Sequence, residues 1–106
     1  MSQIEKGSTN VYVDLGLENA EEMLVKAQLA TKIGEIIKRR KLTQAQAAEV
    51  LGIPQPKLSN MLRGQFRGIS ETKMIECLTR LGRNIEIVVK AAPRSNVAGH
   101  VSVVFA

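Results

Sequence analysis

The sequence predicts a mainly α fold, a compact bundle of four to five helices followed by a short C-terminal β-hairpin. Helical periodicity with capping residues runs from residue 20 to residue 82, and apolar residues alternate with polar ones after residue 84. Hydrophobic residues make up 44% of the chain and charged residues 24%, which is typical of a folded domain. A chain of 106 residues is expected to form one hydrophobic core.

The first predicted helix covers residues 20–41. Asn19, followed three residues later by Glu22, matches a capping box. Apolar residues then recur at steps of three and four, namely Met23, Ala27, Ala30, Ile33 and Ile37. Residues 1–19 contain two glycines and little periodicity, so we expect them to form a loosely structured N-terminal arm.

Two short helices are predicted next. Thr43 and Gln46 repeat the capping-box pattern, and the helix that they start ends at Gly52. The following helix must begin within residues 54–56, because proline is tolerated in the first turn of a helix but not in its interior. Gly64 ends this third helix.

These two helices have the features of a helix-turn-helix unit. Such a unit needs small residues where its helices touch, a glycine in the turn and apolar residues that hold the second helix in place. The sequence supplies them as Ala47, Ala48, Leu51, Gly52, Ile53, Leu58 and Met61. We therefore predict a helix-turn-helix domain over residues 20–83, with an unrelated helical hairpin as the alternative.

The last part of the chain is predicted to contain a helix and two strands. Ser70 is the N-cap of the helix, which closes at Gly82. Residues 84–90 and 101–105 show the alternation of a hairpin. Because an isolated two-stranded hairpin is marginally stable in water, we expect residues 84–106 to be a dimerisation element that pairs with a second copy.

Basic residues gather in the middle of the chain. The chain has 15 Lys and Arg against 10 Asp and Glu, a net charge of +5. Residues 1–31 contain two basic and five acidic residues, whereas residues 32–67 contain eight basic and two acidic ones. This distribution indicates a polyanion partner at the centre, although a basic run is also common on a solvated helix face.

The outward-facing residues of the third helix suit a DNA groove. Glutamine and asparagine pair with adenine, lysine donates to guanine, and proline offers an apolar contact to the thymine methyl group. The predicted DNA-binding residues are Gln44, Gln55, Pro56, Lys57, Ser59, Asn60, Arg63 and Arg67. For each of them the alternative is solvated polar surface. Duplex DNA is favoured over RNA because the chain has only one Tyr, two Phe and no Trp for base stacking.

Other functions find little support in the sequence. Cys77 and His100 are single residues of their kind without a catalytic carboxylate pair or metal-ligand spacing, so we expect no enzyme, no metal and no cofactor. No apolar run approaches the ~20 residues of a membrane helix, and no signal-peptide pattern opens the chain. We expect a cytoplasmic, nucleoid-associated protein with no membrane partner.

Residues 42–64 resemble the helix-turn-helix of Cro/C1-type (XRE) regulators. Together with residues 11–17, 20–23 and 81–89, they make the chain similar to the HigA-like antitoxin subfamily. The resemblance implies a homodimeric bacterial repressor of an inverted-repeat operator, which blocks a RelE/HigB-type toxin and represses their shared promoter. A stand-alone XRE-family repressor is the alternative.

The resemblance also assigns roles by position. It implies that Gln44 contacts phosphate and that the base-reading residues are Gln55, Pro56, Lys57 and Asn60. Pro56 is a departure, since the family usually has a hydrogen-bonding or small residue there. The segment after Ala92 is also longer than the tail that the resemblance leads us to expect.

The acidic arm is where we expect a basic toxin to bind. The residues that would attract it are Asp14 and Glu18 of the arm, together with Glu21 and Glu22 at the start of the following helix. Opposite charge would attract such a partner, and burial of apolar arm residues would offset the entropy lost on ordering. The alternative is an arm that packs on its own domain or exchanges within the dimer.

Overall fold

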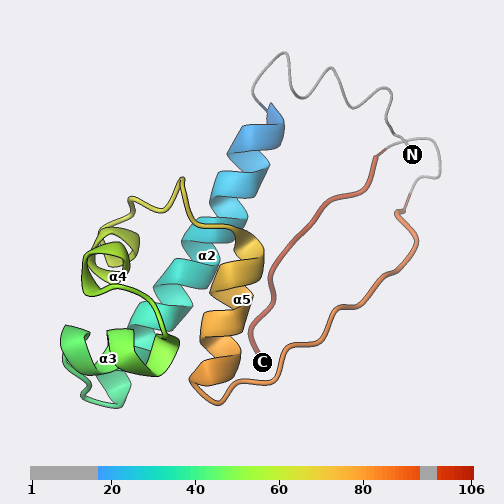
Figure 1. Ribbon diagram of the computed structural model, residues 1–106. Helices are drawn as coiled ribbons and strands as arrows, with labels where there is room; N and C mark the ends of the chain where they lie inside the picture. The colour runs from blue at the N-terminus through green and yellow to red at the C-terminus, as the bar shows by residue number, and fades with distance from the viewer. Residues whose placement is uncertain (1–16, 94–97) are drawn as a thin grey trace.

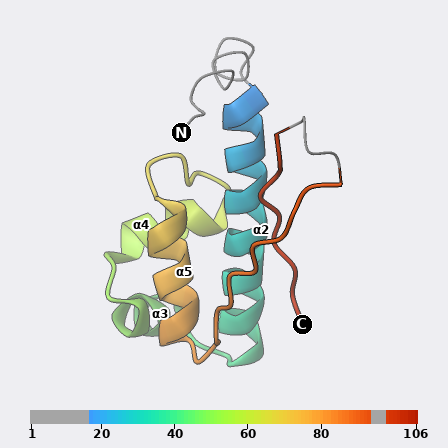
Figure 2. The same ribbon diagram turned by 90° about the vertical axis from the view of Figure 1, so that its right-hand side faces the viewer.

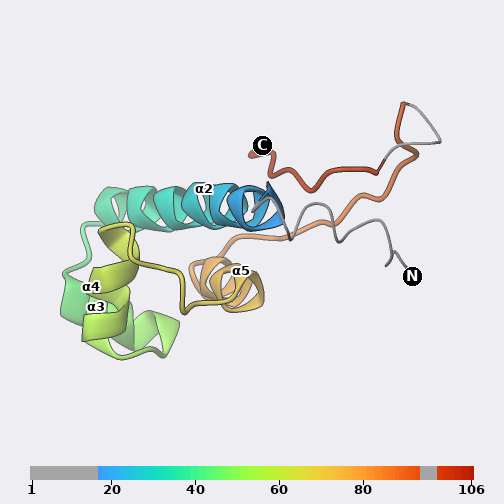
Figure 3. The ribbon, with the colours of Figure 1, turned by 90° about the horizontal axis from the view of Figure 1, so that it is seen from above.

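A computed structural model describes residues 17–93 and 98–106, which form a helical bundle and an extended C-terminal segment (Figure 1). The helices of this part are α2 (Leu17–Arg39), α3 (Gln44–Leu51), α4 (Gln55–Leu62) and α5 (Glu71–Arg80). The long α2 packs against α5, while α3 and α4 lie to one side of this pair (Figures 1 and 3). None of the described helices is both long and apolar enough to cross a membrane.

The structure confirms the predicted caps of α3 and α5. The Thr43 hydroxyl accepts a hydrogen bond from the Gln46 backbone N–H at 3.1 Å, and the Gln46 side-chain oxygen accepts one from the Thr43 N–H at 2.9 Å. The Ser70 hydroxyl likewise accepts the Lys73 N–H at 3.1 Å. The predicted cap at Asn19 is wrong, because α2 already begins at Leu17. Leu17 and Glu18 favour helix, so the helix continues upstream of Asn19.

The turn between α3 and α4 depends on Gly52. This residue has a φ of 70°, in the left-handed region that favours glycine, and its N–H donates to the Ala48 carbonyl at 2.8 Å. The Arg80 guanidinium of α5 lies over the turn, 3.2 Å from where a Cβ at Gly52 would stand. Both the backbone conformation and the close approach of Arg80 therefore favour glycine here.

The hydrophobic core takes side chains from all four described helices. Its largest fully buried members are Ile33, Ile36, Leu51, Leu58, Met61, Met74 and Cys77. Ala47 and Ala48 are buried at the contact between α3 and α4, which confirms the predicted role of small residues there. Burial raises the pKa of the Cys77 thiol, so this side chain stays protonated and acts as a small core residue.

The predicted C-terminal β-hairpin is wrong. The described residues 84–93 and 98–106 form no strand, and no backbone hydrogen bond joins them. Alternating apolar residues favour an extended backbone, but a strand also needs a neighbouring strand to pair with. In this structure, residues 98–106 lie beside α2 instead (Figure 2).

Three side chains of the C-terminal segment hold it against α2 or the core. The His100 Nδ1 atom lies 2.9 Å from a Glu21 carboxylate oxygen. Val103 is half-buried against the core, and the Lys32 ammonium lies 5.2 Å from the centre of the Phe105 ring. The segment thus uses side-chain contacts where the prediction had placed strand pairing.

Candidate DNA-binding surface

Helix α4 has one apolar face and one polar face. Leu58 and Met61 are buried in the core, whereas Gln55, Pro56 and Lys57 in the first turn are exposed. In a helix-turn-helix unit the N-terminal residues of the second helix are the ones that reach base edges. The exposed first turn of α4 is thus the part of this helix that corresponds to the base-contacting end in helix-turn-helix units.

The second turn of α4 carries a network of three predicted site residues. The Arg63 guanidinium donates to the Ser59 hydroxyl at 3.1 Å and also to the Asn60 side-chain oxygen. Ser59 and Asn60 are half-buried, and Arg63 is exposed. Arg63 therefore orients the Asn60 amide, leaving the amide N–H groups to donate to a base. The sequence did not indicate this network, because it predicted each residue as a separate DNA contact.

Gln44 and Arg67 lie outside α4 at opposite ends of the helix-turn-helix. Gln44 is exposed in the first turn of α3, which contains no acidic residue. Arg67 is exposed at the tip of the loop between α4 and α5. The end of α2, α3 and α4 lie on the same side of the molecule, away from the C-terminal segment (Figure 3).

The loop that carries Arg67 is held in place by buried side chains and by a hydrogen bond from α2. Phe66 and Ile69 are buried, and the Ile69 N–H donates to the Phe66 carbonyl at 3.0 Å, which closes a turn. The Lys26 ammonium donates to the Arg67 carbonyl at 3.1 Å and pairs with Glu22 at 3.3 Å. The Lys26 side chain is only 5% exposed, so it ties this loop firmly to α2.

Lys26 is a residue that the sequence analysis missed. Its signal was present, because position 26 lies three residues after Met23 and four before Ala30, on the apolar face of the first helix. A lysine on a buried face needs a polar partner, since an unpaired buried charge is costly. Its position therefore indicated a structural contact that the sequence could not identify.

We expect Lys26→Met to loosen the Arg67 loop without unfolding the domain. Methionine keeps the packing of the aliphatic stem, and the partner Glu22 is 42% exposed, so stability should change by less than about 1 kcal/mol. The Ile69 amide should exchange its hydrogen faster, and DNA affinity should fall by about two- to fivefold for all sequences. Hydrogen-exchange NMR and fluorescence anisotropy measure the two effects.

The matched control for this prediction is Lys32→Met. Lys32 lies on the same helix, pairs with Glu35 at 3.6 Å and is also partly buried, but it does not contact the loop. Equal Ile69 exchange rates in the Lys26→Met variant and the unaltered protein would show that Lys26 does not hold the loop.

Ion pairing leaves the helix-turn-helix side positively charged. The described ion pairs join α2 residues to one another and Glu76 of α5 to Lys73 and Arg80, and the Glu21 carboxylate contacts the His100 ring. The Lys73 ammonium lowers the pKa of the Glu76 carboxyl, so that carboxylate remains ionised beside Arg80. Among the described residues, Lys57, Arg63 and Arg67 form no ion pair, which leaves their charge available to a polyanion.

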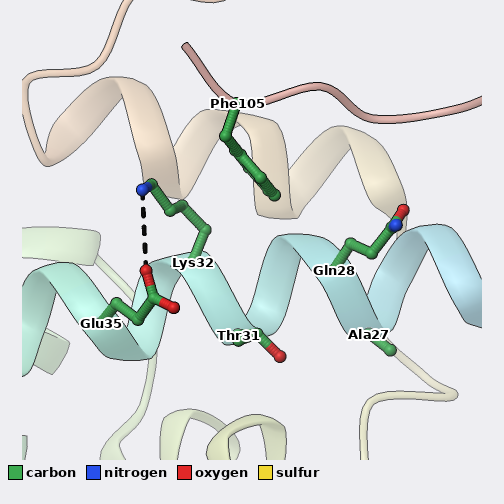
Figure 4. Close-up of a pocket in the computed structure, with 6 residues that line it drawn as sticks. All are labelled: Ala27, Gln28, Thr31, Lys32, Glu35 and Phe105. Carbon is green, nitrogen blue, oxygen red and sulfur yellow. Dashed lines mark ion pairs between the residues drawn. The ribbon is translucent and has the colours of Figure 1, made fainter.

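A pocket lies beside α2. It has a volume of about 240 Å³ and lies between α2 and the C-terminal segment (Figure 4). Its lining residues are Ala27, Gln28, Thr31, Lys32, Glu35 and Phe105. Lys32 and Glu35 pair with each other here, and no group of three metal-binding side chains occurs within residues 17–93 and 98–106.

Comparisons with known proteins agree with this geometry. A family model described as a helix-turn-helix domain matches residues 11–90. A solved structure provisionally described as an XRE-family transcriptional regulator superimposes with a TM-score of 0.76 at 40% sequence identity. The alignment covers 83% of this chain and 99% of that chain. A search of curated proteins found no match.

Proposed function

Because this chain belongs to the XRE-type helix-turn-helix family, we propose that it is a sequence-specific, DNA-binding transcriptional regulator. The observation that carries the proposal is α4, whose buried Leu58 and Met61 leave an exposed first turn of Gln55, Pro56 and Lys57. This helix enters the major groove, and the unpaired basic residues around it supply salt-dependent affinity. The positive surface is thus the DNA-binding surface.

The proposed contacts divide into two kinds. Gln55, Lys57 and Asn60 read base edges through hydrogen bonds, and Pro56 makes at most an apolar contact to a thymine methyl group. Phosphate contacts come from Gln44, Arg63 and Arg67, while Ser59 supports Asn60 through the Arg63 network. The first kind sets sequence choice, and the second adds affinity for any duplex.

Selection from a pool of random duplexes tests this function directly. We expect the purified protein to enrich an inverted repeat whose half-sites lie about 34–36 Å apart, one turn of DNA. Footprinting of the enriched sequence then gives the length of the protected site. Equal binding to all sequences in the pool would overturn the proposal of sequence-specific regulation.

We also propose that the regulator acts as a homodimer joined through the C-terminal segment. Three consecutive apolar residues there are exposed, with Ile87 at 81%, Val88 at 71% and Val89 at 91%. Within residues 17–93 and 98–106 this run has no backbone hydrogen-bonding neighbour, and an exposed apolar run on an extended backbone can pair with a second chain. An inverted-repeat operator would match the two-fold symmetry of that dimer.

We expect Ile87→Asp to convert the dimer into a folded monomer. Ile87 buries little surface in its own chain, so the domain keeps its stability while a charge enters the proposed interface. Light scattering after gel filtration measures the mass, and operator affinity should fall with dimerisation. The control is Leu24→Asp, which places the same charge at an exposed apolar position outside the proposed interface, on α2. An Ile87→Asp protein that remains dimeric would place the interface elsewhere.

The finer function that we propose is that of an antitoxin that represses its own promoter. The resemblance of residues 11–17, 20–23 and 81–89 to HigA-like antitoxins supports it, and a stand-alone repressor remains the alternative. Glu21 and Glu22 each contact a basic side chain of this chain, which makes them weaker candidates for toxin contact. Asp14 lies outside the described residues.

A pull-down from the source cell separates these two functions. The tagged protein is captured, bound proteins are identified by mass spectrometry, and bound DNA is sequenced. A small basic ribonuclease-like partner together with the protein's own promoter supports the antitoxin. Promoter DNA alone supports the stand-alone repressor.

A further inference from the structure

Lys41 has an unusual backbone conformation. Its φ is 57°, and no other non-glycine residue of the described part has a positive φ. It follows α2 in a Schellman motif, in which the Leu42 N–H donates to the Ile37 carbonyl at 3.1 Å and the Lys41 N–H donates to the Lys38 carbonyl at 3.0 Å. Leu42 then packs partly buried against the core.

Glycine is the residue that this position favours. A Cβ in the left-handed region approaches the following carbonyl oxygen, whereas glycine adopts the conformation without this cost. The chain itself follows this rule after α3, α4 and α5, where the residues with positive φ are Gly52, Gly64 and Gly82. Lysine after α2 therefore calls for a reason other than the turn.

The surroundings of Lys41 suggest that reason. Residues 38–41, which we call the basic turn, are four consecutive exposed cations, and none of them forms an ion pair within the described part of the chain. The turn leads directly into Thr43 and Gln44 at the start of α3, on the same side of the molecule as α4 (Figure 3).

The helix dipole does not account for Lys41. Cations in the last turn of a helix are stabilised by its negative end, which explains Lys38 and Arg39 in the last turn of α2. Lys41 lies beyond that turn, where the dipole effect falls off and the backbone cost begins. A cation kept at a strained position next to a DNA-binding helix fits an anionic ligand.

We propose that the basic turn is a phosphate-binding element of the DNA interface and that Lys41 is its principal contact, on the backbone phosphate next to the one that Gln44 meets. This inference rests on the proposed function, because it adds a contact to the same interface. The ligand is the phosphodiester backbone, so the contact adds affinity without adding base preference.

The test is the Lys41→Gly variant, which distinguishes the effect of residue 41 on the stability of the turn from its effect on DNA binding. Glycine relieves the backbone cost, so the thermal midpoint should rise by about 2–6 °C. Because the proposed dimer carries two copies of Lys41, the variant loses two phosphate contacts on the selected inverted repeat, and binding should weaken by about 25- to 100-fold near 0.1 M salt. The slope of log K against log salt concentration should become shallower by about 1.8, which is about 0.9 for each lost contact. A merely structural lysine would not produce higher stability together with weaker binding.

Two further variants serve as controls. Lys41→Arg keeps the cation, so affinity and salt slope should remain close to those of the unaltered protein. Arg83→Gln removes one charge from an exposed position just after α5, which belongs neither to the proposed DNA contacts nor to the proposed dimerisation element, so it measures the effect of net charge alone.

The outcomes distinguish the inference from the proposed function. If Lys41→Gly is more stable but binds the inverted repeat with unchanged affinity and slope, the inference is overturned while sequence-specific binding stands. An equal loss of affinity in Arg83→Gln would also overturn it, because net charge would then explain the effect. If the unaltered protein binds no duplex DNA, the proposed function fails as well.

Discussion

Replacing both Gln55 and Lys57 with alanine is expected to weaken binding by about 2–6 kcal/mol at each half-site of the selected operator. Each side chain contributes about 1–3 kcal/mol of base discrimination, and contributions at separate base pairs add approximately. Both residues are exposed in the first turn of α4, so the fold should not change. Anisotropy titrations with the operator and with a scrambled duplex measure the specific and nonspecific affinities.

The control for this experiment is Arg67→Ala. Its side chain is proposed to contact phosphate, so the substitution should weaken binding to the operator and to the scrambled duplex alike, and it should reduce the salt slope by about one for each bound protomer. If the double variant selects the same operator sequence as the unaltered protein, Gln55 and Lys57 do not read bases.

Leu58→Ala is expected to destabilise the domain by about 2–5 kcal/mol. Leu58 is completely buried in α4, and its truncation removes apolar contacts and leaves a cavity in the core. This cost is a large part of the 5–15 kcal/mol by which domains are typically stable. Urea unfolding followed by circular dichroism measures the change in the free energy of unfolding. Operator affinity should fall too, because α4 loses its anchor on the core.

Leu58→Met provides the matched variant, since it nearly conserves volume and should cost less than about 1.5 kcal/mol. Lys57→Ala, the exposed neighbour of Leu58, should leave the unfolding midpoint nearly unchanged. A Leu58→Ala protein as stable as the unaltered one would mean that α4 is not held by this core contact.

The helix-turn-helix could be predicted because its signals are local and agree with one another. Thr43 and Gln46 define one helix start, Gly52 defines the turn, and Ala47 and Ala48 allow close packing, all within ten residues of chain. The exposed face of α4 then follows from the buried positions Leu58 and Met61.

Long-range contacts could not be predicted in the same way. The alternation after residue 84 indicated an extended chain but not its neighbour, and residues 98–106 lie beside α2 rather than on a second strand. Lys26 reaches a carbonyl 41 residues away, at Arg67, so its burial depends on a loop that no local pattern specifies. The left-handed backbone conformation of Lys41 could not be predicted from the sequence either, because lysine is not typical of that conformation.

Helix α2 contacts two different parts of the molecule at once. Lys26 holds the Arg67 loop beside the DNA-binding surface, while Glu21 and Lys32 contact His100 and Phe105 of the C-terminal segment, whose residues 87–89 we propose as the dimer interface. In a dimer joined through that segment, α2 would set the distance between the two α4 helices that read the DNA. The spacing of operator half-sites then becomes a property of a helix that touches no base. The dimer should bind more weakly to an operator lengthened by one base pair at its centre, although the sequence of each half-site is unchanged.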